Sequence, residues 1–97
     1  DSKLEAARYK QLRLMEKAGE VKDLELQPKF PCEVNGKKIC TYIADFRYKL
    51  KNDKEVVEDV KGVETAVFKL KKKLVEALYP DVTIEIVKNP RFFVIPD

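Results

Sequence analysis

The stretch "YIADFRYKLKNDKEVVEDVKG", residues 42–62, decides the fold of this chain. Two runs rich in β-branched and aromatic residues flank the polar segment "KNDK", a pattern that predicts two antiparallel strands joined by a tight turn. Charged residues nevertheless lie inside both runs, among them Asp45 in the first and Asp59 and Lys61 in the second. A carboxylate that is buried without a partner is costly, so these three residues require an explanation.

The pairing of the two strands predicts where the charged side chains lie. Side chains alternate between the two faces of a strand, so residues two apart share a face. A three-residue turn makes Asp45 face Lys61 across the hairpin, and in the same register Arg47 faces Asp59. The two acids and the lysine then share one face of the sheet, whereas a two-residue turn would separate them.

The remaining sequence supplies two helices and further strands on either side of this hairpin. The order is α-β-β-β-α-β, and its strand–helix–strand unit requires a right-handed crossover and a parallel pair of strands. We therefore expect a single domain over residues 1–97 of the α/β (α+β) class, with a mixed sheet flanked by helices. The expected elements are a helix over residues 2–19, an extended segment over 21–34, strands over 37–50 and 55–62, a helix over 63–79 and a strand over 82–87.

Cap signals and apolar stripes define the two expected helices. Gly19 is the expected stop of the first helix, and Thr65 is the expected N-cap of the second. In the second helix, apolar residues that recur at helical spacing predict the face that packs on the sheet. They are Val67, Leu70, Leu74 and Leu78.

The dipeptide of Asn35 and Gly36 predicts a β-hairpin with a type I′ turn. A two-residue turn pairs Cys32 with Ile39, so that Cys32 and Cys40 lie on opposite faces of the hairpin. We expect both thiols to be reduced, because a disulfide would need a bulge or a longer loop.

Composition excludes several classes of protein. The chain has 97 residues with a net charge of +3, which permits nucleic-acid binding without demanding it. Histidine is absent and serine occurs only at Ser2, which excludes Ser-His nucleophilic chemistry. No apolar run reaches the length of about 18 residues that a membrane span needs. The first residues are charged and lack the apolar core of a signal peptide, so we expect a cytoplasmic protein.

Two carboxylates and a lysine on one sheet face suit metal-dependent hydrolysis of a phosphodiester. Asp45 and Asp59 offer hard oxygen ligands, which Mg²⁺ or Mn²⁺ takes together with water and phosphate oxygens. Lys61 would orient the attacking water or stabilise the charge that develops on the phosphate. The alternative is a set of structural ion pairs on a solvated face. Glu58 points to the opposite face, toward solvent or a helix.

The same residues resemble the motif of the PD-(D/E)XK nuclease superfamily. Asp45 in "AD" corresponds to its first acid, and "DVK" at residues 59–61 corresponds to (D/E)-x-K with an apolar middle residue. The segments "SKLEAARYKQLRLMEKAGEV", "LELQPKF", "TYIADFRY" and "EDVKG" look like a small phage-encoded family related to Holliday-junction resolvases. Ala44 stands where the motif of the superfamily has proline.

The resemblance implies a restriction-endonuclease-like core and a Mg²⁺- or Mn²⁺-dependent DNA endonuclease that acts on branched DNA such as a Holliday junction. It implies the backbone carbonyl of Val60 as a metal ligand beside Asp45 and Asp59, and it adds Glu5 of the first helix as a further catalytic residue and metal ligand. Ser2-x-x-Glu5 is also a capping box, in which Glu5 bonds back to the start of the helix. The alternative function is a nuclease-fold DNA-binding module without catalysis.

Charge and resemblance together indicate the partners. Five lysines would contact DNA phosphates or else belong to solvated surfaces; they are Lys37, Lys38, Lys69, Lys72 and Lys73. A resolvase cuts two symmetric strands, which implies a homodimer. The apolar segment over residues 91–96 would form an interface or fold back on its own core. The sequence assigns no role to Gln27.

Overall fold

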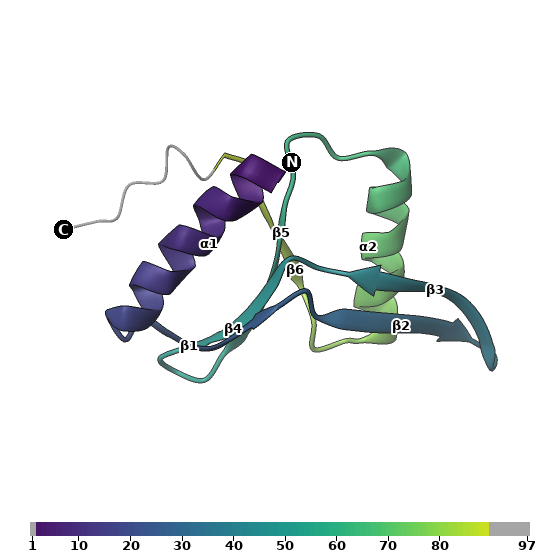
Figure 1. Ribbon diagram of the computed structural model, residues 1–97. Coiled ribbons are helices and arrows are strands. Elements are labelled where there is room, and N and C mark those ends of the chain that lie inside the picture. Colours follow the sequence, from purple (N-terminus) through teal and green to yellow (C-terminus); the bar gives the residue numbers. More distant parts are fainter. Residues whose placement is uncertain (1, 90–97) are drawn as a thin grey trace.

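Two helices and six strands form the α+β fold that the computed structural model describes over residues 2–89 (Figure 1). The fold class predicted from the sequence is confirmed. The elements are α1 (Ser2–Lys17), β1 (Val21–Leu26), β2 (Lys29–Val34), β3 (Lys37–Ile43), β4 (Phe46–Leu50), β5 (Glu55–Val60), α2 (Ala66–Leu78) and β6 (Ile84–Val87). The apolar segment over residues 91–96 lies outside the described residues.

The strands of the described region form a four-stranded sheet in the order β1-β4-β5-β6 and a separate hairpin of β2 and β3. β4 pairs antiparallel with β1 and with β5, whereas β5 and β6 are parallel, as the crossover through α2 requires. The hairpin of β2 and β3 continues from β1 and β4 and extends away from α1, past α2 (Figure 1). The mixed sheet that the sequence predicts is therefore present.

Both long extended segments are interrupted at the same level. β1 gives way to β2 at Gln27 and Pro28, and β3 gives way to β4 at Ala44 and Asp45, so the continuous strand expected over residues 37–50 is wrong. Regular pairing stops because Gln27 has a positive φ of 53° and Pro28 has no N–H. The Gln27 N–H still donates to the Asp45 carbonyl at 2.9 Å. A second bond, from the Ala44 N–H to the Pro28 carbonyl at 3.1 Å, keeps the two segments paired through the interruption.

The hairpin of β4 and β5 has a different register from the one predicted. Regular pairing ends earlier in β4 than expected, which lengthens the turn. Arg47 therefore lies opposite Val57 instead of Asp59, and Asp45 is displaced from Lys61 by the same shift. Because the shift amounts to two residues, the side chains of the paired residues of β4 and β5 keep the faces that the sequence predicts.

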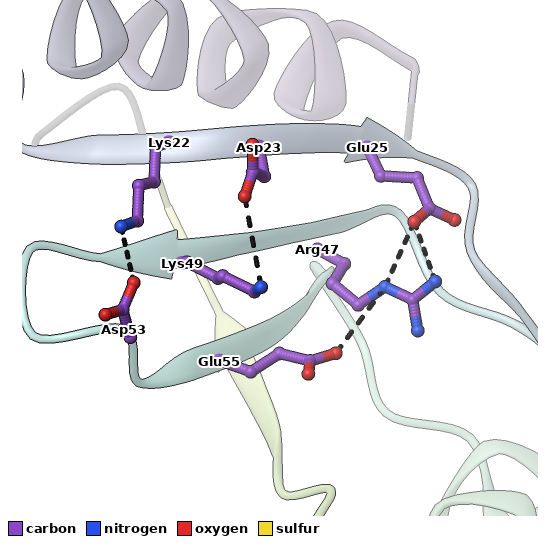
Figure 2. Close-up of polar contacts among 7 residues, drawn as sticks. All are labelled: Lys22, Asp23, Glu25, Arg47, Lys49, Asp53 and Glu55. Atoms are coloured by element: carbon purple, nitrogen blue, oxygen red, sulfur yellow. Dashed lines mark hydrogen bonds and ion pairs between the residues drawn. The ribbon is translucent and has the colours of Figure 1, made fainter.

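Ion pairs on the exposed side of the sheet engage Arg47 (Figure 2). Its guanidinium donates to Glu25 Oε1 from Nε at 3.1 Å and from Nη2 at 2.7 Å, and it lies 3.6 Å from Glu55. Two further pairs in the same view are Lys49 with Asp23 and Lys22 with Asp53. Arg47 thus has acidic partners on β1 and at the start of β5, and its predicted partner Asp59 is not among them.

Each helix covers its own cluster of buried side chains. Leu12 of α1 packs with Phe46 of β4, and both are at most 2% exposed. Phe68 and Val75 of α2 pack instead with residues of the hairpin and its neighbours, including Phe30. The β2–β3 hairpin is therefore part of the core and not a loosely attached arm.

The apolar face predicted for α2 is wrong except at Leu74, which packs against the core. Val67, Leu70 and Leu78 are 63%, 69% and 36% exposed, whereas Phe68 and Val75 are buried. The helix turns Phe68 inward because the hairpin, with which it shares a core, lies on that side. The predicted N-cap is confirmed, since the Thr65 hydroxyl accepts a bond from the Phe68 N–H at 3.1 Å.

The turn between β2 and β3 has the predicted type, but the cysteines lie differently. Asn35 and Gly36 have φ values of 52° and 77°, both positive as a type I′ turn requires. A bulge after Cys32 moves it opposite Cys40, so the prediction of opposite faces is wrong. Both cysteines are free thiols, and burial, together with a hydrogen bond with Cys40, raises the pKa of Cys32.

A buried ion pair joins α1 to β5. Arg8 donates to the two carboxylate oxygens of Glu58, from Nε at 2.9 Å and from Nη2 at 2.7 Å. The two side chains are only 8% and 4% exposed. The Tyr48 hydroxyl donates to the same carboxylate. Of the two surroundings predicted for Glu58, solvent or a helix, the helix is therefore confirmed.

Replacing Arg8 by Met should destabilise the protein by about 3–5 kcal/mol, because Glu58 would remain buried as an unpaired charge. The double variant Arg8→Met/Glu58→Leu should recover most of that loss, since neither charge of the pair is then left without its partner. Urea unfolding of each variant measures both effects.

The exposed pair of Arg13 and Glu16, 3.1 Å apart on the same helix, supplies the control. Arg13→Met should cost less than about 1 kcal/mol. If Arg8→Met costs no more than Arg13→Met, the buried pair does not hold α1 in place.

Candidate functional site

Segments that are distant in the sequence meet where β5 ends. α1 begins beside the end of β5 and the loop that leads to α2 (Figure 1). A Cβ atom added at Gly62 of that loop would lie 3.8 Å from Leu4 Cδ1 of α1. The interruption between β3 and β4 brings Asp45 to the same place, where its N–H donates to the Glu58 carbonyl at 3.1 Å. The elements that carry the predicted site residues therefore converge.

Asp45 is fixed by the backbone of β5. In addition to the bond from its own N–H, its Oδ2 atom accepts a hydrogen bond from the Val60 N–H at 2.8 Å. The side chain thus takes the place of a backbone acceptor at the point where the strand is interrupted. This bond holds the Asp45 carboxylate against the residue that follows Asp59 in β5.

Asp59 is almost completely buried, at 1% exposed. Lys61 Nζ lies 3.8 Å from its Oδ1 atom, while its Oδ2 atom has no hydrogen-bond partner among the described residues. Burial raises the pKa of Asp59 to about 6; the charge of Lys61 lowers the pKa and that of Glu5 raises it. A buried carboxylate with an unsatisfied oxygen is costly and is the kind of group that a cation satisfies.

Lys61 lies between the acids and the start of α2. Its Nζ atom lies 4.8 Å from the centre of the Phe68 ring, a cation–π contact, and its backbone N–H donates to the Val87 carbonyl at 3.0 Å. The side chain is 33% exposed. Lys61 and Lys71 also line a shared hollow of about 360 Å³. The lysine is therefore held in place but open to a ligand.

Glu5 lies beside Asp45, as the site interpretation requires. Burial raises the pKa of Glu5, and the charge of Asp45 and a side-chain hydrogen bond with Asp45 raise it further. Ser2, the capping residue of the alternative interpretation, is itself the first residue of α1. A negative charge this close to the Glu5 carboxyl favours the binding of a proton or a cation there.

The structure brings together Glu5, Asp45, Asp59 and Lys61, and it places the five predicted DNA-binding lysines differently. Lys37 and Lys38 are exposed at the outer end of the β2–β3 hairpin, away from the start of α1 (Figure 1). On α2, Lys69 and Lys73 are exposed, while Lys72 Nζ lies 3.0 Å from Glu76. Lys71, which the sequence places in the same lysine-rich stretch of α2, lines a hollow together with Lys61.

The donor set suits a cation that also takes ligands from water and substrate. Within residues 2–89, no group of three or more Asp, Glu, His or Cys side chains forms a cage for a metal ion. Mg²⁺ typically needs less, since one or two carboxylates suffice when water and phosphate oxygens complete its coordination. Asp45 and Asp59 fit that requirement, and the Val60 carbonyl stays a predicted ligand.

A cavity of about 390 Å³ opens beside the acids. Glu5 and Tyr9 of α1 line it, together with Gln27 and Asp45 from the two strand interruptions. Sequence reasoning missed Tyr9 and found no role for Gln27. The sequence offers one sign of Gln27, a polar amide directly before proline in an otherwise apolar segment. Its place in the cavity depends also on the second strand interruption, at Asp45.

Comparison with known proteins gives a family for the chain. A family model with the description "Protein of unknown function (DUF1064)" matches residues 1–93. The chain belongs to this family. No curated protein and no solved structure matches it. In the part of this DUF1064 chain that the structure describes, neither helix is long and apolar enough to cross a membrane.

Without metal, Asp59→Asn should stabilise this DUF1064 protein at neutral pH. The pKa of Asp59 in the folded state, about 6, exceeds the value of an exposed aspartate, about 3.9. The folded state therefore binds the proton more tightly, and its stability falls as the pH rises from about 4 to about 6. Asp59→Asn should melt above the parent at about pH 7.5 and lose this advantage near pH 4.

Calorimetry in EDTA measures the two melting temperatures. Asp53→Asn is the matched control, because exposed Asp53 has its pKa lowered by a hydrogen bond with Lys22 and by the charge of Lys22. This control should show no gain at about pH 7.5. If Asp59→Asn melts at or below the parent at that pH, the Asp59 carboxylate is not a destabilising buried charge in the folded protein.

Proposed function

We propose that the protein is a Mg²⁺- or Mn²⁺-dependent DNA endonuclease that hydrolyses phosphodiester bonds. The observation that carries the proposal is the buried Asp59 carboxylate, whose Oδ2 atom has no partner among the described residues. It lies with Lys61 and Asp45 at the end of β5, where negative charge exceeds what the lysine compensates. A divalent cation would supply the missing charge. The resemblance to PD-(D/E)XK nucleases supports the same chemistry.

Each residue has a distinct role in the proposed reaction. Asp45 and Asp59 would hold the cation with the Val60 carbonyl, and a bound Mg²⁺ polarises the phosphate and acidifies a water molecule. The bond from the Val60 N–H fixes the orientation of Asp45 before any metal binds. Lys61 lies 3.8 Å from Asp59 and would orient the attacking water or stabilise charge on the phosphate. Glu5, beside Asp45, would be a further residue that holds the cation.

The substrate and assembly in this proposal follow from the resemblance to resolvases. Branched DNA such as a Holliday junction has two strands to cut, which a homodimer would present to two sites. Exposed lysines of α2, together with Lys71, which lines a hollow with Lys61, would contact phosphates. A phage origin and action in the cytoplasm of the host belong to the same proposal. The free thiols of Cys32 and Cys40 fit a reducing compartment.

A DNA-binding module without catalysis is the alternative function. A module of this kind would not need the buried charge of Asp59, because burial of an uncompensated carboxylate lowers stability. Labelled linear, nicked, single-stranded and four-way-junction DNA, each with Mg²⁺ or EDTA, separate the two functions. Binding without cleavage on all four substrates in Mg²⁺ and in Mn²⁺ would favour the module.

Asp45→Asn and Asp59→Asn should each abolish cleavage in Mg²⁺ while DNA binding remains. Asparagine keeps an oxygen that can accept the Val60 N–H, so Asp45→Asn should retain its fold. Cleavage of the preferred substrate and its binding in Ca²⁺ are measured for each variant. The control is Asp53→Asn, which changes an exposed aspartate in the turn between β4 and β5. This variant should cleave as the parent does. An Asp59→Asn enzyme that cleaves at the rate of the parent would refute the assignment.

Glu5→Gln distinguishes the two interpretations of Glu5. A glutamine serves a capping box as well as a glutamate does, so the melting temperature should barely change. Loss of cleavage with unchanged melting temperature supports a role in the site, whereas full activity leaves Glu5 a structural residue. Lys61→Ala is the companion variant and should slow cleavage far more than it weakens Mg²⁺ binding, since the lysine is not a ligand.

A further inference from the structure

The cavity beside the acids has two chemically different sides. Glu5 and Asp45 form its acidic end, which it shares with the candidate metal site. Tyr9, Leu26 and Gln27 form much of the remaining wall. Its volume of about 390 Å³ lies within the range of sites that hold small organic groups. Whatever occupies this cavity is therefore a direct neighbour of the reacting phosphate in the proposed nuclease.

The charges of the wall restrict the occupant. Among the described lining residues, the charged side chains are Glu5 and Asp45, and both are acidic. A phosphate inside the cavity would meet these carboxylates without a compensating lysine, because Lys61 lines a different hollow. The phosphate therefore belongs at the cation, and the group that enters the cavity is uncharged.

The wall also offers a flat apolar surface. The Tyr9 ring stacks on Phe46 at a centroid distance of 6.4 Å and an interplanar angle of 10°. Phe46 is 2% exposed and fixed in the core, whereas Tyr9 remains 37% exposed. A planar ligand that stacks on an aromatic side chain gains binding free energy whatever its identity. Leu26, at 53% exposed, extends the apolar surface.

Gln27 adds a hydrogen-bonding group at a fixed position. Its φ of 53° is unfavourable for a residue with a side chain, and such conformations cluster at functional sites. Its N–H donates to the Asp45 carbonyl at 2.9 Å, which locks its backbone to that of a candidate metal ligand. The side-chain amide can donate and accept hydrogen bonds, as the edge of a nucleobase requires.

We propose that this cavity binds the base of an unpaired nucleotide adjacent to the scissile phosphate, with the base stacked on Tyr9 and its edge bonded to Gln27. The inference rests on the proposed function, because it takes the phosphate to lie at Asp45 and Asp59. A base paired and stacked within a duplex cannot enter a cavity of the protein, so the nucleotide must already be unpaired or must be turned out. Preference for branched or otherwise distorted DNA follows from this site.

Binding of two DNA duplexes tests the inference without cleavage. Both carry one extrahelical nucleotide at the same position, an adenosine in one and an abasic analogue in the other. Fluorescence anisotropy in Ca²⁺, at one fixed salt concentration, gives the ratio of the two affinities. The protein should bind the base-bearing duplex about 5- to 150-fold more tightly, the range expected for one stacked base. Tyr9→Ala should bring the ratio close to one.

Three further variants separate stacking from folding and from charge. Tyr9→Phe keeps the ring and should keep the ratio. Gln27→Gly removes the amide but adopts the positive φ without strain, so it should lower the ratio without loss of stability. Lys10→Ala, next to Tyr9 on α1, should weaken binding of both duplexes equally.

The possible results distinguish this inference from the proposed nuclease activity. A ratio near one in a protein that cleaves DNA overturns the base site and leaves the nuclease intact. A high ratio that Tyr9→Ala abolishes, in a protein that cleaves nothing, supports the base site and overturns the nuclease. Failure to bind either duplex overturns the base site and leaves the nuclease to the cleavage assay. A ratio that neither Tyr9→Ala nor Gln27→Gly changes likewise overturns the base site.

Discussion

The buried ion pair between Arg8 and Glu58 is the constraint on which the rest of the structure depends. Leu12 is the one apolar side chain of α1 that is fully buried, with Leu4 and Met15 partly buried beside it, so apolar packing alone specifies the position of the helix weakly. Glu58 cannot remain in the core as an unpaired charge, and the helix therefore docks with Arg8 against β5. Glu5 lies almost one helical turn before Arg8, and Asp59 directly follows Glu58. One interaction thus sets the spacing between the two halves of the candidate site.

The sequence predicts the order of the elements and the faces of the central strands because these depend on local periodicity. Asp45, Asp59 and Lys61 converge although the predicted register is wrong. A shift of two residues leaves the alternation of side chains unchanged, whereas a shift of one would have placed Asp59 on the face of Glu58. Parity alone therefore predicted the shared face of Asp59 and Lys61. The position of Asp45 depends also on the interruption between β3 and β4, which parity does not predict.

The features that the sequence could not predict all depend on contacts between distant segments. Pro28 signals one strand interruption. The second, at Asp45, exists because the two paired segments of the chain bend together. An arginine in a helix is usually exposed, and Arg8 is buried because Glu58, far along the chain, requires a partner. The buried face of α2 was misplaced for the same reason, since it is set by the β2–β3 hairpin and not by the four-stranded sheet.

The irregular course of β1 has a consequence for the behaviour of the protein in concentrated solution. β1 is an edge of the four-stranded sheet, and a regular edge strand is a template onto which another polypeptide can add. Its pairing with β4 shifts between Lys22 and Glu25, where Asp23 has a φ of 56°. The exposed backbone groups are thus out of line with those of an incoming strand, and the charged side chains beside them repel or hydrate it. A substitution that straightened β1 would leave the fold almost unchanged and would expose the protein to edge-to-edge aggregation.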